Sequence, residues 1–332
     1  MTEASTNTVL VTGESVSRAH LQRLTDAGLI VINPAESFPP AILAEDDLAH
    51  VLEPCVGYIL GGDEVASRKV LERARSLKVL AFLGVGYESF VDTEAATDLH
   101  IPVTSTPGVL ANSVAEFTVG LLLDARRNIT RFATEPGFPQ NKARDLSGHA
   151  VGIVGLGAAG SRIAEILRKG FGAEVSYFSR TRKPALEESL GIRYASLEDI
   201  TASVESLILM VPETPDTTNL LTSSLLLSRS SSNPMIVINT ARAEVIEPQA
   251  ILQAVESGAV SALWFDGYYR DATDATRSLE VSPSVFVTPH VASLTHDARD
   301  AMSTMAVESI LKILKTGSDE AIVNPTYLAQ GT

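Results

Sequence analysis

Cysteine is almost absent from this chain. Cys55 is the only one in 332 residues, so the sequence excludes an intramolecular disulfide and a cysteine metal cluster, and we expect no metal site. A lone cysteine of this kind is most often a small apolar core residue. Basic residues are also scarce, since 26 lysines and arginines face 40 acidic residues and leave a net charge of −14. This balance argues against nucleic acid or an anionic membrane as a partner.

Long hydrophobic segments are absent as well. No apolar run approaches the roughly twenty residues that a bilayer-spanning helix needs, so we expect no membrane association. The start of the chain, MTEASTNT, is polar and lacks the basic and apolar parts of a signal peptide. We therefore predict a cytoplasmic protein. A length of 332 residues allows about two domains.

Short apolar runs that alternate with helical patterns are what the chain has in quantity. The first strand candidates are 8–13, 29–34, 56–62, 77–84 and 101–107, and a long helix is predicted over roughly 111–130. The second set of strand candidates is 151–154, 173–179, 207–212, 235–240, 261–266 and 285–290. This alternation predicts parallel sheets covered by helices. The expected fold class is therefore α/β, with two doubly wound parallel-sheet domains.

Three glycines connect a strand to a helix in HAVGIVGLGAAG (149–160). At the G-x-G-x-x-G spacing, Gly155 would make the tight turn and Gly157 would let backbone N–H groups approach a pyrophosphate. Gly160 would let the following helix, predicted over 161–169, pack closely on the strand, and the N-terminus of that helix would face the phosphates. A plain strand-to-helix turn is the alternative. The strand before, the helix after and a second strand beyond it favour a dinucleotide site.

The residues about twenty positions beyond these glycines indicate which dinucleotide binds. An acid there would accept hydrogen bonds from the ribose 2′-hydroxyl of NAD and would repel the 2′-phosphate of NADP. This chain has Ser179, Arg180, Thr181 and Arg182 instead. A hydroxyl and guanidinium groups suit a phosphate, because charge-assisted bidentate pairs are strong. A solvated basic loop is the alternative, but its position after the second strand favours NADP(H) over NAD(H).

Three chemically useful side chains follow the last three predicted strands, where open α/β sheets place their ligands. They are Arg242, Asp271 and His290. Hydride transfer to a 2-oxo acid needs a cation for the carboxylate, a proton donor for the carbonyl oxygen and a carboxylate that keeps the imidazole charged. Each residue alone has an ordinary explanation as a surface arginine, a solvated loop aspartate or a structural histidine. Their combination beside a dinucleotide loop favours a reductase.

A series of ordered segments resembles the D-isomer-specific 2-hydroxyacid dehydrogenase family over nearly the whole chain. They are LGVGYESFVD (83–92), TPGVLANSVAEFTVGLLLDARR (106–127), GLGAAG, VPETPDTTNLL (211–221), NTARAEVIE, GAVSALWFDGYYRDA (258–272) and TPHVAS. The resemblance implies a flavodoxin-like substrate domain, residues 1–105 plus 297–332, and a Rossmann dinucleotide-binding domain, residues 106–296. It also implies a homodimer that pairs about the long helix, although a core helix would have the same apolar residues.

The resemblance also implies a role for each matching residue. Arg242 would hold the substrate carboxylate and polarise the carbonyl, His290 would be the general acid/base, and Asp271 lies where the histidine's carboxylate partner is expected. The implied substrate-binding backbone is that of Leu83, Gly84, Val85 and Gly86. The implied cofactor-binding residues are Gly155, Leu156, Gly157, Ala158, Ala159, Gly160, Ser179, Arg180, Thr181, Arg182, Val211, Pro212, Thr240, Ala241, Asp266, His290 and Ala292. Asp266 matches an aspartate that is associated with the nicotinamide carboxamide.

Two residues depart from the family pattern. The family usually has a glutamate where this chain has Asp271, so the side chain is one methylene, about 1.5 Å, shorter. An aspartate within about 4–6 Å of the histidine would still favour the imidazolium. The second departure is Ala243, where a glycine normally follows the arginine. If that position required a positive φ, alanine would strain the loop that directs Arg242.

The sequence therefore predicts an NADPH-dependent reductase of small 2-oxo acids, of the glyoxylate or hydroxypyruvate type, that gives D-2-hydroxy acids. The alternative is a dinucleotide-sensing binding protein or corepressor that has the same fold and weakened catalysis, because fold alone does not fix function. Turnover would distinguish the two. The sequence leaves the side chain of the substrate open.

Overall fold

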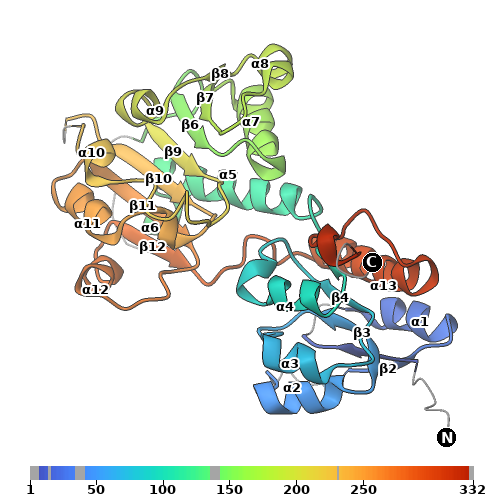
Figure 1. Cartoon of the computed structure of the whole chain (residues 1–332). Coiled ribbons are helices and arrows are strands. Elements are labelled where there is room, and N and C mark those ends of the chain that lie inside the picture. The colour runs from blue at the N-terminus through green and yellow to red at the C-terminus, as the bar shows by residue number, and fades with distance from the viewer. Residues whose placement is uncertain (1–6, 14–15, 34–41, 135–142, 230–231, 329–332) are drawn as a thin grey trace, which may run out of the picture. The chain divides into compact units, whose positions relative to one another are not determined.

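The computed structural model describes residues 7–13, 16–33, 42–134, 143–229 and 232–328 (Figure 1). The chain divides into two compact units, Met1–Leu110 with Thr295–Thr332, and Ala111–Leu294. The first six residues, which make up most of the polar start, lie outside the described residues. None of the described helices combines the length and the hydropathy that crossing a membrane requires.

The first unit contains a five-stranded parallel sheet with the order β2-β1-β3-β4-β5. Its strands are β1 (Thr8–Val11), β2 (Ile30–Ile32), β3 (Cys55–Leu60), β4 (Val79–Phe82) and β5 (Val103–Thr104). Its helices are α1 (Arg18–Asp26), α2 (Glu45–Leu52), α3 (Arg68–Arg73), η1 (Tyr87–Ser89), α4 (Thr93–Asp98), α13 (His296–Thr316) and η3 (Pro325–Leu328). This strand order is that of flavodoxin-like folds. The C-terminal helix α13 belongs to this unit and packs against β3, β4 and α1.

Both faces of the central strands β1, β3 and β4 are buried, which explains why these strands are mainly apolar. On one face, Leu10, Tyr58 and Leu80 belong to a core cluster with residues of α2, α3 and α4. On the other face, Val9 and Ile59 belong to a cluster with residues of α1 and α13. Successive residues of β1 thus point to opposite faces, as the two-residue period of a strand requires.

The second unit contains a seven-stranded parallel sheet with the order β12-β11-β10-β9-β6-β7-β8. Its strands are β6 (Ala150–Val154), β7 (Glu174–Phe178), β8 (Arg193–Tyr194), β9 (Ser206–Leu209), β10 (Met235–Asn239), β11 (Val260–Asp266) and β12 (Val285–Thr288). Its helices are α5 (Ala111–Arg127), α6 (Ile129–Thr134), α7 (Ala158–Phe171), α8 (Pro184–Leu190), α9 (Leu197–Ser203), α10 (Ser223–Leu226), η2 (Ala243–Val245), α11 (Pro248–Glu256) and α12 (Asp274–Glu280). The first six strands have the Rossmann order, and β12 extends it.

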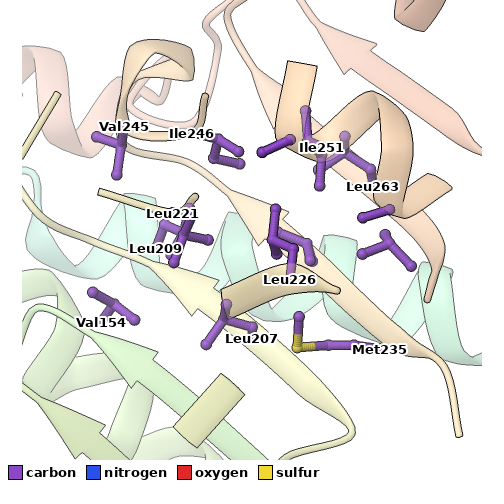
Figure 2. Close-up of a cluster of buried hydrophobic side chains, with 14 of the residues drawn as sticks. Val154, Leu207, Leu209, Leu221, Leu226, Met235, Val245, Ile246, Ile251 and Leu263 are labelled. Carbon is purple, nitrogen blue, oxygen red and sulfur yellow. The ribbon is translucent and has the colours of Figure 1, made fainter. Parts of the chain in front are cut away.

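Two hydrophobic clusters cover the faces of the second sheet. Figure 2 shows part of one cluster, in which strand residues such as Leu207 and Leu263 pack with Leu226 of α10 and Ile251 of α11. The other cluster packs residues of α5 and α7 on the opposite face of the sheet. Strand order reverses between β6 and β9, so the carboxyl ends of these strands form the crevice where ligands of open sheets bind.

The prediction of two doubly wound α/β units is confirmed, with two local differences. The helix predicted over 111–130 ends at Arg127, because Asn128 adopts a left-handed φ of +52°. Asparagine tolerates this conformation better than most residues. Asp124 then accepts hydrogen bonds from the N–H and the hydroxyl of Thr130 at 2.8 and 2.6 Å, which fixes the start of α6. The two-residue strand β8 was not predicted, because two residues give no period.

Candidate active site

The loop between β6 and α7 has the backbone geometry that a dinucleotide pyrophosphate requires. Gly155 has a φ of +103°, and a Cβ atom there would lie 2.5 Å from the carbonyl oxygen of Met210. A Cβ atom on Gly160 would collide with the carbonyl oxygen of Gly155, so α7 approaches the loop as closely as only glycine permits. A Cβ atom on Gly157 would meet nothing within 4 Å. The space beside Gly157 is therefore open. Gly157 directly precedes α7, and the N–H groups in the first turn of a helix lack helical acceptors. These residues therefore fit a pyrophosphate.

The loop after β7 holds its two arginines differently. Arg182 donates from Nε and Nη2 to the two carboxylate oxygens of Glu187 at 2.8 and 2.7 Å, and it lies 5.9 Å from the centre of the Tyr194 ring. The Ser179 hydroxyl donates to the carbonyl oxygen of Thr181 at 2.6 Å. Arg180 is exposed, and within the described residues its guanidinium has no hydrogen bond or ion pair. Of the two arginines, Arg180 is the one that is available to a phosphate.

Glu187 should make the stability of this loop sensitive to acid. The hydrogen bonds from Arg182 and then from Tyr177 lower the pKa of Glu187 from 4.5 to about 2. A lowered pKa in the folded state contributes stability above about pH 4.5, and this contribution is lost as the pH falls toward about 2. We expect the melting temperature of the wild type to fall more steeply between these pH values than that of Glu187→Gln. Parallel pH profiles of the two melting curves would contradict the assignment.

Arg242 follows β10 in a segment whose backbone is fixed by Asn239. The Asn239 side chain donates from Nδ2 to the carbonyl oxygen of Arg242 at 2.9 Å and accepts from the N–H of Ala241 at 3.0 Å. The Arg242 guanidinium donates from Nη1 to the carbonyl oxygen of Ala241 at 3.0 Å. Ala243 is buried in η2 and does not have a positive φ. The alanine therefore causes no backbone strain, because this position does not need the conformational freedom of glycine.

Asp266 is buried at the end of β11 and holds the loop that carries His290. One carboxylate oxygen accepts from the Thr288 hydroxyl at 2.7 Å and from the N–H of Val291 at 2.8 Å, and the other accepts from the N–H of Ala292 at 2.8 Å. His290 has a left-handed φ of +56°, which is uncommon for a residue with a side chain. The Asp266 carboxylate thus holds the Thr288 side chain before His290 and the backbone directly after it. Its predicted contact with the nicotinamide carboxamide stays a prediction.

The loop after β11 brings Gly267, and not Asp271, against His290. Gly267 has a φ of +91°, and a Cβ atom there would lie 3.3 Å from Nδ1 of His290. The Asp271 side chain is exposed, and within the described residues its carboxylate has no hydrogen bond or ion pair. Only its carbonyl oxygen is used, as an acceptor for the Thr276 hydroxyl at 3.2 Å. The structure does not join Asp271 to His290, and their pairing stays a prediction.

The other predicted cofactor residues of the second unit lie along the carboxyl ends of β9 and β10. Val211 is half-buried, and Pro212 is exposed and accepts at its carbonyl oxygen from the Thr217 hydroxyl at 2.5 Å. The hydroxyl oxygens of Thr240 and Thr118 lie 2.7 Å apart. Because the Thr118 hydroxyl donates to the carbonyl oxygen of Val114 at 2.6 Å, Thr240 is the donor of this pair. This hydrogen bond joins the end of β10 to α5.

The predicted substrate loop lies in the first unit, directly after β4. The N–H of Leu83 donates to the carbonyl oxygen of Leu60 at 2.9 Å, and the N–H of Gly84 donates to that of Phe82 at 3.1 Å. Within the described residues, the N–H groups of Val85 and Gly86 have no acceptor. Of the four predicted residues, Val85 and Gly86 are therefore the ones whose backbone donors are available to a carboxylate.

Comparison with known proteins identifies the family. A family model described as the NAD binding domain of D-isomer specific 2-hydroxyacid dehydrogenases matches residues 119–292. This match covers more than half of the chain. The chain belongs to the D-isomer specific 2-hydroxyacid dehydrogenase family. It is therefore an oxidoreductase with a Rossmann domain that binds a nicotinamide dinucleotide.

Two curated relatives of this D-2-hydroxyacid dehydrogenase family member extend the likeness to most of the chain. The glyoxylate reductase of Aeropyrum pernix is 33% identical over 267 residues, which cover 77% of this chain and 78% of that protein. Glyoxylate/hydroxypyruvate reductase B of Yersinia enterocolitica is 30% identical over 294 residues, which cover 86% of this chain and 89% of that protein.

Solved structures of related proteins have the same fold. The TT0316 protein of Thermus thermophilus has a TM-score of 0.83 and 30% identity, and the match covers 95% of this chain and 99% of that one. An NADPH-dependent glyoxylate/hydroxypyruvate reductase from Sinorhizobium meliloti, solved with NADP and malonate, has a TM-score of 0.77 and 28% identity. That match covers 96% of this chain and 97% of the other.

Sequence reasoning missed three charged residues at the carboxyl edge of this dehydrogenase's second sheet. Arg270 lies in the loop after β11 and pairs with Glu213, after β9, and with Glu244, after β10. The acids lie within motifs that were already recognised, VPETPDTTNLL and NTARAEVIE. No spacing rule joins residues on three separate loops, so only their charges and their places directly after strands could have suggested the cluster.

Proposed function

We propose that this enzyme reduces a small 2-oxo acid of the glyoxylate or hydroxypyruvate type to a D-2-hydroxy acid, with NADPH as the hydride donor. The observation that carries the proposal is the placement of Arg242 and His290 directly after β10 and β12, the two neighbours of β11 in the sheet that carries the glycine loop. The names of the curated relatives support the substrate class.

Each of the two residues would do a separate part of the chemistry. Bound NADPH would supply the hydride to the carbonyl carbon. The Arg242 guanidinium would bind the substrate carboxylate and polarise the carbonyl, because a planar fork of donors matches a carboxylate. The His290 imidazolium would donate its proton to the carbonyl oxygen as negative charge develops there, and it would take the proton back in the oxidation direction. In the first unit, the N–H groups of Val85 and Gly86 would bind a carboxylate oxygen.

Turnover with a panel of substrates tests this function. The purified enzyme should oxidise NADPH when glyoxylate, hydroxypyruvate, pyruvate or phenylpyruvate is added. Trp264 is the only tryptophan of the chain, and it lies two residues before the carboxyl end of β11, so its fluorescence should report dinucleotide binding independently. Binding without turnover of any of these acids, with NADPH and with NADH, would refute the reductase and favour a dinucleotide-binding protein.

Arg180 should determine the preference for NADPH. A charge-assisted contact to the 2′-phosphate contributes about 1.5–3 kcal/mol, so Arg180→Ala should raise the KM for NADPH roughly 10- to 100-fold. The KM for NADH should change little, because NADH has no phosphate at this position. Arg277→Ala is the matched control, since it removes the same charge from an exposed residue of α12. Equal changes in KM for both cofactors, or a wild type that prefers NADH, would contradict this role.

The oligomeric state and location of the enzyme stay predictions. The buried residues of α5 include Ala115, Val119 and Leu122, which pack in the core of the second unit. The apolar content of this helix is thus largely explained by the core, and a homodimer rests on the family resemblance. Sedimentation equilibrium of the purified protein would test it. The cytoplasmic location rests on the sequence.

A further inference from the structure

Arg270 ties together three loops at the carboxyl edge of the second sheet. Its backbone N–H and its Nε both donate to the same oxygen of Glu244, each at 3.0 Å. Its Nη2 donates to Glu213. These contacts join the loop after β11 to the segments that follow β10 and β9, which are its successive neighbours in the sheet.

The two acids are less exposed than the arginine between them. The side chains of Glu213 and Glu244 are 23% and 19% exposed, whereas that of Arg270 is 58% exposed. Two partly desolvated carboxylates without a shared cation would repel each other and any approaching anion, and this repulsion is stronger away from bulk water. Arg270 therefore neutralises charge that water alone would screen only in part.

The same edge carries further cross-links that fix the backbone of the segment containing Glu244. The N–H of Asn219 donates to the carbonyl oxygen of Glu244 at 2.8 Å, and the Tyr269 hydroxyl donates to the carbonyl oxygen of Ile246 at 3.0 Å. Glu244 is only two residues beyond Arg242. An acid so close along the chain would compete with a substrate carboxylate for the Arg242 guanidinium if its own partner were removed.

We propose that Arg270 is a positioning residue that occupies Glu213 and Glu244, so that Arg242 stays available to the carboxylate of the substrate. This role rests on the proposed function, because it presumes a substrate with a carboxylate. Arg270 need not touch the substrate, since it acts through the two acids. Because Arg270 also joins three loops, its removal can lower stability as well, and the triple variant below separates that effect from the effect on substrate binding.

Substitution of Arg270 tests this role through the division of the effect between KM and kcat. Arg270→Gln should raise the KM for glyoxylate about tenfold, through the two uncompensated acids, while kcat changes less than about threefold. The triple variant Glu213→Gln/Glu244→Gln/Arg270→Gln should restore the KM, because it removes the competing charges as well. Arg277→Gln, the matched loss of a charge on α12, should leave the KM unchanged.

Each contrary result has a distinct meaning. An unchanged KM in Arg270→Gln, or a loss confined to kcat, would overturn the proposal. A triple variant with the KM of Arg270→Gln would also overturn it, because the effect would then come from loop packing and not from the acids. Calorimetric binding of oxamate to the wild type with NADPH or NADH is measured first. If the wild type neither binds oxamate nor reduces any 2-oxo acid, the proposed function itself has failed.

Discussion

Replacement of His290 by asparagine should lower kcat by roughly 10²- to 10⁴-fold, the usual contribution of a positioned general acid. Asparagine is similar in size but has no proton to donate near neutral pH, so the carbonyl oxygen would have to take its proton from water. The measurement is steady-state reduction of glyoxylate at saturating NADPH. Trp264 fluorescence should show nearly unchanged NADPH binding in the variant, which separates lost chemistry from lost cofactor.

The companion variant Asp271→Asn should lose much less activity than His290→Asn. The Asp271 carboxylate is exposed and has no partner within the described residues, so it cannot stabilise the imidazolium through a short contact in this conformation. An opposite charge at longer range in water contributes little. Equal losses in the two variants would show that Asp271 does pair with His290 during the reaction. No loss in either would mean that the roles are misassigned.

The strand pattern and the glycines were readable because local physics determines them. Strands that are buried on both faces of a parallel sheet are continuously apolar, and this made 56–62 and 207–212 recognisable. The glycine loop was equally readable, because φ at Gly155 and the packing at Gly160 exclude other residues. The end of α5 at Arg127 could not be read from the sequence, since an asparagine within a helical pattern does not by itself predict the left-handed conformation of Asn128.

The site was predictable as a set of positions but not as a set of contacts. Arg242 and His290 could be placed because ligands of open α/β sheets lie at the carboxyl ends of strands. The pairing of Arg182 with Glu187, which lies in α8, depends on how the loop after β7 folds back on that helix. A basic run in the sequence shows the charges that are present, while the folded loop decides which of them remains free.

The conformation of the loop after β10 also had to come from the structure. The sequence raised the question of strain at Ala243, because glycine is the family's residue there, but it could not supply the backbone angles. The structure places Ala243 in a short 3-10 helix without a positive φ. This departure therefore gives no reason to expect weakened catalysis, and of the two departures only Asp271 bears on the chemistry.

Asp266→Ala should destabilise the second unit and disable the enzyme together. The substitution removes the acceptor of three hydrogen bonds at a residue that is 4% exposed, from the Thr288 hydroxyl and from the N–H groups of Val291 and Ala292. The Thr288 hydroxyl keeps a second acceptor, the carbonyl oxygen of Phe265 at 3.2 Å, but the N–H groups of Val291 and Ala292 lose theirs. Each buried donor left without an acceptor costs about 1–3 kcal/mol, so the free energy of unfolding should fall by about 2 kcal/mol or more. Urea denaturation followed by Trp264 fluorescence measures this loss.

Asp266→Asn separates the positioning of His290 from global stability. Asparagine has nearly the same shape but a single oxygen, so its amide nitrogen must face a donor of the loop on one side, whichever way the amide is turned. His290 has a left-handed backbone, and a conformation of this kind typically costs about 1–3 kcal/mol. With a weaker contact from residue 266, this conformation would be less firmly held. We expect a folded enzyme with reduced kcat, whereas Asp274→Ala, the matched loss of an exposed acid on α12, should keep wild-type kcat. Full activity in Asp266→Asn would show that the loop around His290 does not depend on this carboxylate.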